Sequence, residues 1–288
     1  MRILEVETFG RGGLVHYAHN LSSALAGRGH DVTLLTAAGY ELEKRALPEG
    51  VRLVKGIARF TGGRGRALPG PLLAWARRVE AVADALAVTA LARRERPDVV
   101  HFHCTNPASA LYLTLLRRAG GPLVATAHVV TPHERIPLQR AVYRRVHQAP
   151  DLVVAHSEFD RRRLVDEFAV PPGRVVVIPH GEYGFFARDE RPDRGEARRS
   201  LGLEPQDEVV LFFGYVREYK GLDVLLDAWP AVREARPRAR LVVAGDPVRL
   251  DPERRRALEE QANRLAAVVR LEFIPFSDVA RYFAAADV

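Results

Sequence analysis

The stretch 209-VVLFFGYVREYKGLDVLLDAW-229 combines an apolar run, a short polar turn and an amphipathic run. The apolar run is typical of a buried parallel strand, predicted over residues 208–214, and the amphipathic run predicts a helix over 221–234. Strand–turn–helix units of this kind build parallel sheets that helices cover on both faces. The turn also carries Arg217 and Lys220, although lysine is rare here: only three of the 43 Lys and Arg residues are lysines.

The same alternation of strands and helices runs through the rest of the chain. It predicts an α/β fold with two Rossmann-like, doubly wound parallel-sheet domains: a first over 1–181, a linker with a short helix over 182–206, and a second over 207–288. Two such domains would place a ligand cleft between them, at the carboxyl ends of their strands. The predicted strands are 2–6, 31–36, 51–56, 98–103, 122–128, 152–157, 174–179, 208–214, 239–245 and 268–274.

The helical segments between these strands are amphipathic. In the first of them, LVHYAHNLSSALAGRGH (14–30), an apolar face is predicted from the spacing of Leu14, Tyr17, Leu21 and Leu25, with the end of the helix at Gly27 and Gly29. Further helices are predicted over 72–94, 252–266 and 277–285.

The second domain is predicted to be incomplete. It offers three clear strands, and a fourth begins in FAAADV (283–288), whereas a doubly wound domain normally has five or six. We therefore expect the sequence to be a fragment of a longer protein.

Composition restricts the class of protein. A single cysteine, Cys104, excludes an internal disulfide and fits a reducing cytoplasm. No run of 18 apolar residues predicts a membrane-spanning helix, and Glu5 and Glu7 interrupt any signal-peptide core. The expected location is therefore cytoplasmic, with the inner face of the membrane as a further option. The net charge of +7 indicates anionic partners.

Two strand–helix turns are candidate phosphate sites. After residue 214, Arg217 and Lys220 are favoured as the groups that hold a diphosphate beside a helix N-terminus; the alternative is that both are solvated loop cations. In FGRGGLVHYAHN (9–20), Gly12 and Gly13 would let a phosphate or sugar approach the backbone. This second turn does not match the dinucleotide fingerprint, and a purely structural role is an equal alternative.

Histidines gather at the predicted strand ends. His128 ends one predicted strand and is the candidate polar catalytic group, while His103 and His16 are candidates for the acceptor or sugar side. The alternative is a hydrogen-bonded packing role. A metal site made of His101, His103 and Cys104 is not favoured, because adjacent strand residues point to opposite faces; no metal is therefore predicted.

Two basic helical runs, 140–148 and 159–168, are most simply solvated helix faces; the alternative is contact with an anionic membrane surface. The Gly- and Pro-rich loop over 61–71 is either an acceptor loop or a connection without a role of its own, and the sequence leaves both open. The basic residues are spread along the chain without a recognised nucleic-acid-binding module, so nucleic acid is not an expected partner.

Taken in order, these motifs resemble the retaining glycosyltransferases of family 4 (glycosyl transferases group 1), which have the GT-B fold. The matching segments run along essentially the whole chain: the Gly12–Gly13 turn, ATAH ending at His128, VVAHSEFDRRRL (153–164), VVVIPHGEY (175–183), FFGYVREYKGLDVLL (212–226) and LVVAGDP (241–247). The arginine and lysine spaced three apart in an FFG…KG context are the most specific of these.

The resemblance implies a hexosyltransferase-like enzyme that uses a UDP- or GDP-linked sugar. Arg217 and Lys220 would grip the diphosphate and stabilise the charge on the leaving nucleotide, and His128 would lie near the transferred sugar. It further implies retention of configuration without an obligatory metal, and a glycan, lipid-linked or small-molecule acceptor. The family also uses two glutamates eight apart, beyond the segment that ends here at Val288, so a C-terminally truncated and inactive donor domain is expected.

Two alternatives stay open. One is a non-catalytic nucleotide-sugar-binding remnant, which would bind the donor without consuming it. The other is a nucleotide-sugar epimerase of the GT-B fold, which would need acidic residues in the cleft.

Overall fold

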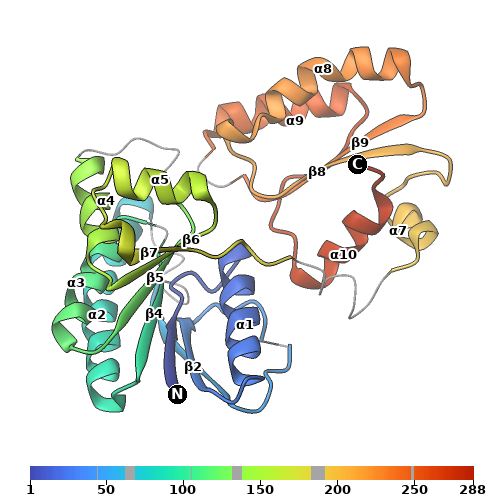
Figure 1. The fold of residues 1–288 in the computed structure, drawn as a ribbon. Coiled ribbons are helices and arrows are strands. Elements are labelled where there is room, and N and C mark those ends of the chain that lie inside the picture. The colour runs from blue at the N-terminus through green and yellow to red at the C-terminus, as the bar shows by residue number, and fades with distance from the viewer. Residues whose placement is uncertain (44, 62–68, 105, 132–137, 183–191, 248–249) are drawn as a thin grey trace. The chain divides into compact units, whose positions relative to one another are not determined.

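The computed structural model describes residues 1–288 except 44, 62–68, 105, 132–137, 183–191 and 248–249. The chain divides into two compact units, Met1–Gly181 and Glu182–Val288 (Figure 1). None of the helices in the described part of the chain has the length and apolar character needed to cross a bilayer.

The first unit is built on a seven-stranded parallel sheet. Its strand order is β3-β2-β1-β4-β5-β6-β7. Successive strands are added on one side of β1 up to β3 and on the other side from β4 onward, as in a doubly wound fold. All seven predicted strands are present. The elements are β1 (Arg2–Val6), α1 (Gly13–Ala26), β2 (Asp31–Ala37), β3 (Val51–Ile57), α2 (Gly70–Glu95), β4 (Val99–Cys104), α3 (Ser109–Ala119), β5 (Leu123–Ala127), α4 (Gln139–Gln148), β6 (Leu152–Ala155), α5 (Glu158–Asp166), the 3-10 turn η2 (Pro172–Arg174) and β7 (Val175–Val177).

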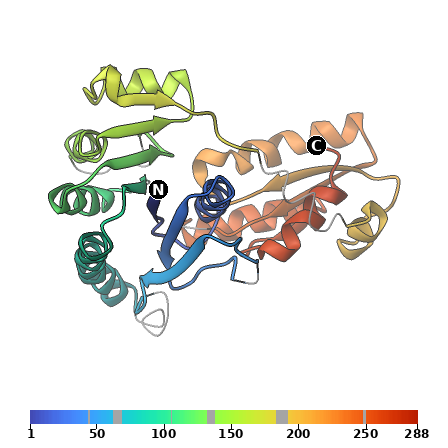
Figure 2. The ribbon, with the colours of Figure 1, turned by 60° about the horizontal axis from the view of Figure 1, so that its bottom comes forward.

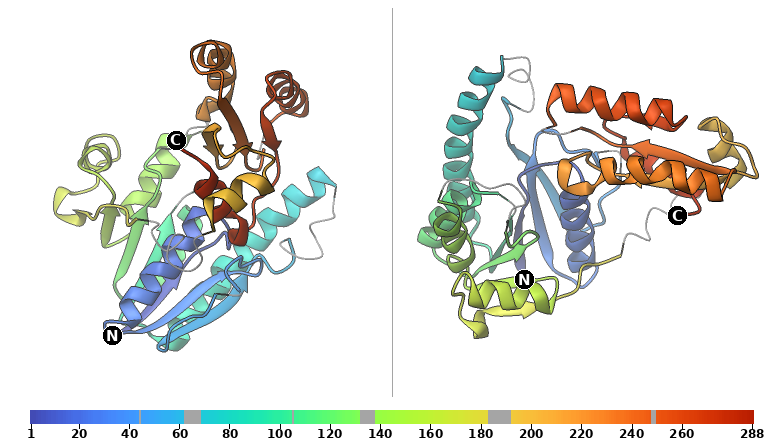
Figure 3. Two further views of the ribbon diagram at one scale, coloured as in Figure 1. Left: turned by 90° about the vertical axis from the view of Figure 1, so that its right-hand side faces the viewer. Right: turned by 90° about the horizontal axis from the view of Figure 1, so that it is seen from above.

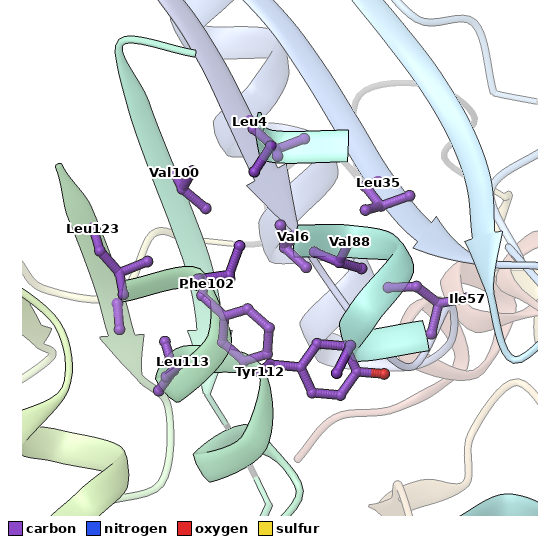
Figure 4. Packing of buried hydrophobic residues seen from close by; sticks show 14 of the residues in the cluster. Leu4, Val6, Leu35, Ile57, Val88, Val100, Phe102, Tyr112, Leu113 and Leu123 are labelled. Atoms are coloured by element: carbon purple, nitrogen blue, oxygen red, sulfur yellow. The ribbon is translucent and has the colours of Figure 1, made fainter. Parts of the chain in front are cut away.

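Helices cover both faces of this sheet. In Figure 2, α1 lies on one side of the first strands and α2 and α3 lie on the other. The core beneath α2 and α3 joins strand residues such as Leu4 and Phe102 to Val88, Tyr112 and Leu113 from the helices (Figure 4). Burial of these side chains, at roughly 1.5–3 kcal/mol each, fixes the sheet and therefore the edge at which its strands end.

Helix α1 buries a different face from the predicted one. Tyr17 and Leu21 are only half-buried, whereas Val15, Ala18 and His19 are buried against the sheet. His19 is tolerated there because its Nδ1 lies 2.6 Å from the Tyr40 hydroxyl. Apolar periodicity misplaced the face because it counted this satisfied histidine as polar.

The second unit has a three-stranded parallel sheet in the order β10-β9-β8. Helices α8 and α9 cover one face, around Leu226, Trp229 and Leu241, and lie side by side in Figures 1 and 3; α7 and α10 cover the other, around Val209 and Tyr282. Its elements are α7 (Arg194–Ser200), β8 (Glu208–Phe213), the 3-10 turn η3 (Glu218–Lys220), α8 (Leu222–Ala235), β9 (Ala239–Ala244), α9 (Pro252–Arg264), β10 (Val268–Arg270) and α10 (Phe276–Ala285).

The residues predicted to begin a fourth strand run along β8. The Asp287 amide donates to the Val209 carbonyl at 2.8 Å, and the Leu211 amide donates to the Val288 carbonyl at 2.8 Å. The predicted fold class, two Rossmann-like α/β domains, is confirmed. The predicted cleft between the domains and the predicted truncation stay predictions. Of the predicted loop over 61–71, residues 62–68 lie outside the described residues.

Candidate functional site

A row of histidines lines the carboxyl edge of the first sheet. His101 and His103 lie on β4, and His128 follows the last residue of β5. His156 and His180 stand just after the ends of β6 and β7. Because the strands are parallel, their carboxyl ends meet at one edge, where α/β sheets bind ligands.

These side chains form a chain of close polar contacts. His103 Nε2 lies 2.8 Å from Glu5 Oε2, and His103 Nδ1 lies 3.2 Å from His128 Nε2. His128 Nδ1 in turn lies 3.4 Å from His156 Nε2. The second Glu5 oxygen lies 3.1 Å from His101 Nδ1. The structure brings His103 and His128 into contact, and their predicted roles stay predictions; Glu5 and His156 were not among the predicted site residues.

Tyr17 from α1 closes the cluster. Its ring centroid lies 4.6 Å from that of His128, 5.1 Å from that of His180 and 5.4 Å from that of His156. Predicting Tyr17 as part of an apolar face therefore missed its position among the histidines.

Burial decides the protonation of the cluster. Burial would raise the pKa of Glu5, but the charge interactions and hydrogen bonds of His101 and His103 outweigh it and lower that pKa to about 2. Burial, followed by the neighbouring histidines, lowers the pKa of His128 to about 2, and burial also lowers the pKa of His103 and His156. At neutral pH the cluster therefore holds an ionised Glu5 carboxylate together with neutral His103, His128 and His156, whose rings can orient one another and bind hydroxyl groups.

The glycine turn is tied to a different carboxylate. Gly12 has φ +73° and immediately precedes α1, which begins at Gly13. The Gly12 amide donates to Glu41 Oε1 at 2.9 Å, and His16 Nε2 lies 2.8 Å from the same oxygen. His16 is therefore oriented toward Glu41. The predicted roles of Gly12, Gly13 and His16 stay predictions.

In the second unit, the turn with Arg217 and Lys220 joins β8 to α8, as the sequence predicted. It is anchored by Val216, which is fully buried and whose amide donates to the Asp246 carbonyl at 2.9 Å. Arg217 is half-buried with its Cζ 5.7 Å from the Tyr215 ring centroid; Lys220 is exposed with its Nζ 5.5 Å from that of Tyr219.

A close backbone contact fixes where this turn leaves the sheet. Gly245, at the end of β9, has φ +151°, and a Cβ added there would lie 1.8 Å from the Gly214 carbonyl oxygen. Only glycine allows this approach, so the sequence LVVAGDP helps to position the turn at 214–221.

Some residues of the histidine row carried a signal in the sequence. His156 lies near the end of the predicted strand 152–157, His180 follows the predicted strand 174–179, and Glu5 is an acidic residue between the apolar Leu4 and Val6. Within the described residues, two groups bring potential ligand atoms to within 4.8 Å of one another: His128, His156 and His180, and Glu5, His101 and His103. The sequence argument against a metal considered only residues adjacent in sequence, and the prediction of no metal stays a prediction.

Known families match both units. The family model of Glycosyltransferase Family 4 matches residues 11–181, and that of Glycosyl transferases group 1 matches residues 207–288. The chain belongs to glycosyltransferase family 4. The resemblance drawn from its motifs is thereby confirmed.

Curated relatives are named as glycosyltransferases. The D-inositol 3-phosphate glycosyltransferase of Segniliparus rotundus is 31% identical over 294 residues, covering 96% of this chain and 63% of the relative. That of Actinosynnema mirum is 34% identical over 248 residues, covering 81% and 57%. The chain thus spans about three fifths of the length of these relatives.

Solved structures share the fold of this glycosyltransferase family 4 chain. Anabaena Alr3699/HepE, in complex with UDP-glucose, has a TM-score of 0.70 at 20% identity, covering 100% of this chain and 72% of that one. The UDP-GlcNAc 2-epimerase of Neisseria meningitidis, bound to UDP-GlcNAc, has a TM-score of 0.64 at 11% identity, covering 99% and 76%. At these identities the likeness concerns the fold alone.

Proposed function

We propose that this protein transfers a sugar from a nucleoside-diphosphate sugar to an acceptor with retention of configuration. Membership of glycosyltransferase family 4 supports the reaction class. The observation that carries the proposal is the pair of cations, Arg217 and Lys220, in the turn between β8 and α8. A strand–helix turn with two cations is suited to a diphosphate.

The donor is a UDP- or GDP-linked sugar. A fold neighbour of this chain binds UDP-glucose, which supports a nucleotide sugar as the ligand. Arg217 offers a fork of N–H donors to the diphosphate, and Lys220 offers a compact charge. As the glycosidic bond breaks, both stabilise the negative charge that develops on the leaving nucleotide, so the donor diphosphate needs no metal ion.

On the acceptor side, His128 orients the sugar or the acceptor. Its Nε2 contacts His103, which is held by the Glu5 carboxylate, and its Nδ1 faces His156. The relatives are named for D-inositol 3-phosphate, which supports a small polyhydroxylated acceptor. A glycan or a lipid-linked acceptor is the other class.

The epimerase alternative receives less support. It needs carboxylates that can exchange protons with the substrate. Glu5 and Glu7, at the end of β1, are fully buried and hydrogen-bonded: Glu5 to His101 and His103, and Glu7 to the amides of Phe9 and Gly10 and the hydroxyl of Thr36.

The test combines binding and turnover. Calorimetry with UDP and GDP measures whether the chain binds the nucleotide, and release of nucleotide from UDP- and GDP-sugars, with and without inositol phosphate, measures transfer. Acceptor-dependent release supports the proposal. Nucleotide binding without consumption of any donor would favour the non-catalytic nucleotide-sugar-binding protein. Conversion of the donor into its epimer would favour the nucleotide-sugar epimerase.

We further propose that the protein works at an anionic membrane surface. On α2, large apolar side chains are exposed at helical spacing, beside the exposed Arg77 and Arg78; these side chains are Leu72, Trp75, Val79, Val82 and Leu86. Such a face suits the lipid interface. In the basic run 159–168, by contrast, Arg161 and Arg163 form ion pairs with Glu158 and Glu167.

Co-sedimentation with vesicles tests this surface. Binding to vesicles with anionic lipid, weakened in a Trp75→Ser variant, supports the proposal. Equal binding by that variant, or no preference for anionic over neutral lipid, would contradict it.

A further inference from the structure

We propose that His128, His156 and His180 form a binding site for a divalent cation of the zinc class. One ring nitrogen from each histidine lies within 4.8 Å of those of the other two. The three residues follow the ends of the neighbouring strands β5, β6 and β7, so the sheet itself brings them together. The proposal does not depend on sugar transfer and can be tested without it.

Hydrogen-bond chemistry fixes which nitrogen of His128 and His156 carries a lone pair. His156 Nδ1 lies 3.0 Å from the Ile178 carbonyl oxygen, which can only accept, so Nδ1 carries the hydrogen and Nε2 the lone pair. His103 Nε2 must likewise donate to the Glu5 carboxylate, which leaves His103 Nδ1 to accept from His128 Nε2. His128 Nδ1 therefore carries a lone pair as well.

As a result, two lone pairs face each other across 3.4 Å, from His128 Nδ1 and His156 Nε2. This arrangement is unfavourable unless an electrophile lies between them. Tetrahedral zinc bound at 2.0–2.1 Å to two imidazoles holds their nitrogens about 3.3 Å apart. The separation in this structure is that of two zinc ligands.

His180 completes the donor set. Its Nδ1 donates to the Gly181 carbonyl at 2.8 Å, so Nε2 is its basic nitrogen. Each of the three histidines thus has its other ring nitrogen directed to a carbonyl oxygen or, through His103, to a carboxylate. This is the outer-shell pattern that orients metal-binding histidines. Three histidine ligands leave a fourth position for water or a substrate oxygen, and the exposure of His180 gives access to it.

The second group, Glu5, His101 and His103, is better explained as a structural network. Glu5 and His103 are fully buried, and both Glu5 oxygens already accept histidine N–H groups. His101 Nε2 also lies 2.8 Å from the Thr126 hydroxyl. This group therefore supports the cation site by fixing the ring of His103 and, through it, that of His128.

With a cation bound, the histidine cluster gains a different role. The oxygen of a sugar, polyol or phosphate would reach the fourth coordination position instead of Nδ1 of His128. The site would then select for ligands with an oxygen donor at the edge of the first unit, at a distance in sequence from the cations of the second.

The experiment is calorimetric titration of Zn²⁺ into tag-free, chelator-treated protein. One Zn²⁺ per chain is expected to bind, with affinity falling at least tenfold in His156→Gln and His180→Gln. His30→Gln, a histidine outside the cluster, is the matched control and is expected to bind as the parent does. Circular dichroism confirms that each variant is folded.

A second readout separates the cation from a bridging proton. The ¹⁵N imidazole resonances of His128 Nδ1 and His156 Nε2 are expected to show unprotonated nitrogen without metal and to shift on addition of one equivalent of Zn²⁺. No binding, equal binding by His156→Gln, or resonances of a protonated pair that zinc leaves unchanged would overturn the proposal. Loss of binding in His101→Gln alone would place the cation at the Glu5 group and also overturn it.

Discussion

The two candidate sites hold polar side chains in opposite ways. In the first unit, the Glu5 carboxylate and the ring of His103 are fully buried, and each polar atom is held by its neighbour. In the second unit, Lys220 is exposed and lies over the ring of Tyr219. The first site is ordered by the fold itself, whereas the second must order a long side chain when a ligand binds. The difference predicts stability effects from the first and mainly binding effects from the second.

The largest effect is expected from Glu5→Ala in the first unit. Removing the carboxylate leaves buried N–H groups of His101 and His103 without their acceptor, at a cost of about 3–5 kcal/mol of unfolding free energy. Denaturant unfolding measures it. Glu5→Gln, which keeps an oxygen acceptor, is the control and is expected to lose less. If both variants were as stable as the parent, the buried network would not stabilise the first unit.

Gly245→Ala should disturb the second site without touching its cations. The added Cβ would meet the Gly214 carbonyl, so the backbone has to move, and we expect a loss of about 3 kcal/mol. Gly202→Ala is the matched control, because it also has positive φ, +72°, but meets nothing within 4 Å; about 1–2 kcal/mol is expected there. Fluorescence of the buried Trp229 in a Trp75→Phe background reports unfolding of this unit. Equal losses in the two variants would show that the close contact does not matter.

Lys220→Ala should change ligand affinity and leave stability nearly unchanged. A charge-assisted contact to phosphate contributes ~1.5–3 kcal/mol, so affinity for UDP or GDP is expected to fall more than tenfold. Lys55→Ala is the control, since Lys55 pairs with Glu43 in the first unit. Unchanged affinity in Lys220→Ala would remove this residue from the diphosphate site.

The two sites also differed in how far the sequence could predict them. The turn with Arg217 and Lys220 is local, because strand, cations and helix follow one another directly within residues 208–235, and the pattern placed it correctly. The histidine cluster depends on contacts between distant segments: Glu5 and His103 are 98 residues apart. The strand ends predicted His103 and His128, but only the strand order shows that His156 and His180 lie beside them.

The fold was predictable for the same reason. Runs of β-branched residues mark each parallel strand, and helices of suitable length separate them, so the element order follows from local pattern. The buried face of α1 was not predictable, because His19 is buried through a contact with Tyr40, 21 residues away. Apolar periodicity does not identify a buried polar residue whose hydrogen-bond partner is distant in sequence.

The two units should respond differently to pH, because all ten histidines lie in residues 1–181. Burial lowers the pKa of His147 and of His19 from 6.5 to about 4 each. Between these values the unfolded chain binds protons that the folded unit does not, so stability is lost as pH falls from 6.5 toward 4. Over this range each of the two histidines lowers the free energy of unfolding by about 1.4 kcal/mol per pH unit.

Hydrogen exchange measured by mass spectrometry, corrected for intrinsic rates, follows both units in one sample. Between pH 7 and 5 we expect protection to fall in the first unit while the second stays constant. In His147→Gln, the side-chain amide can still donate to the Val130 carbonyl. The slope of the unfolding free energy against pH should then decrease by the equivalent of about one bound proton. Parallel loss in both units, or an unchanged slope in this variant, would show that buried neutral histidines are not what separates the two halves of the molecule.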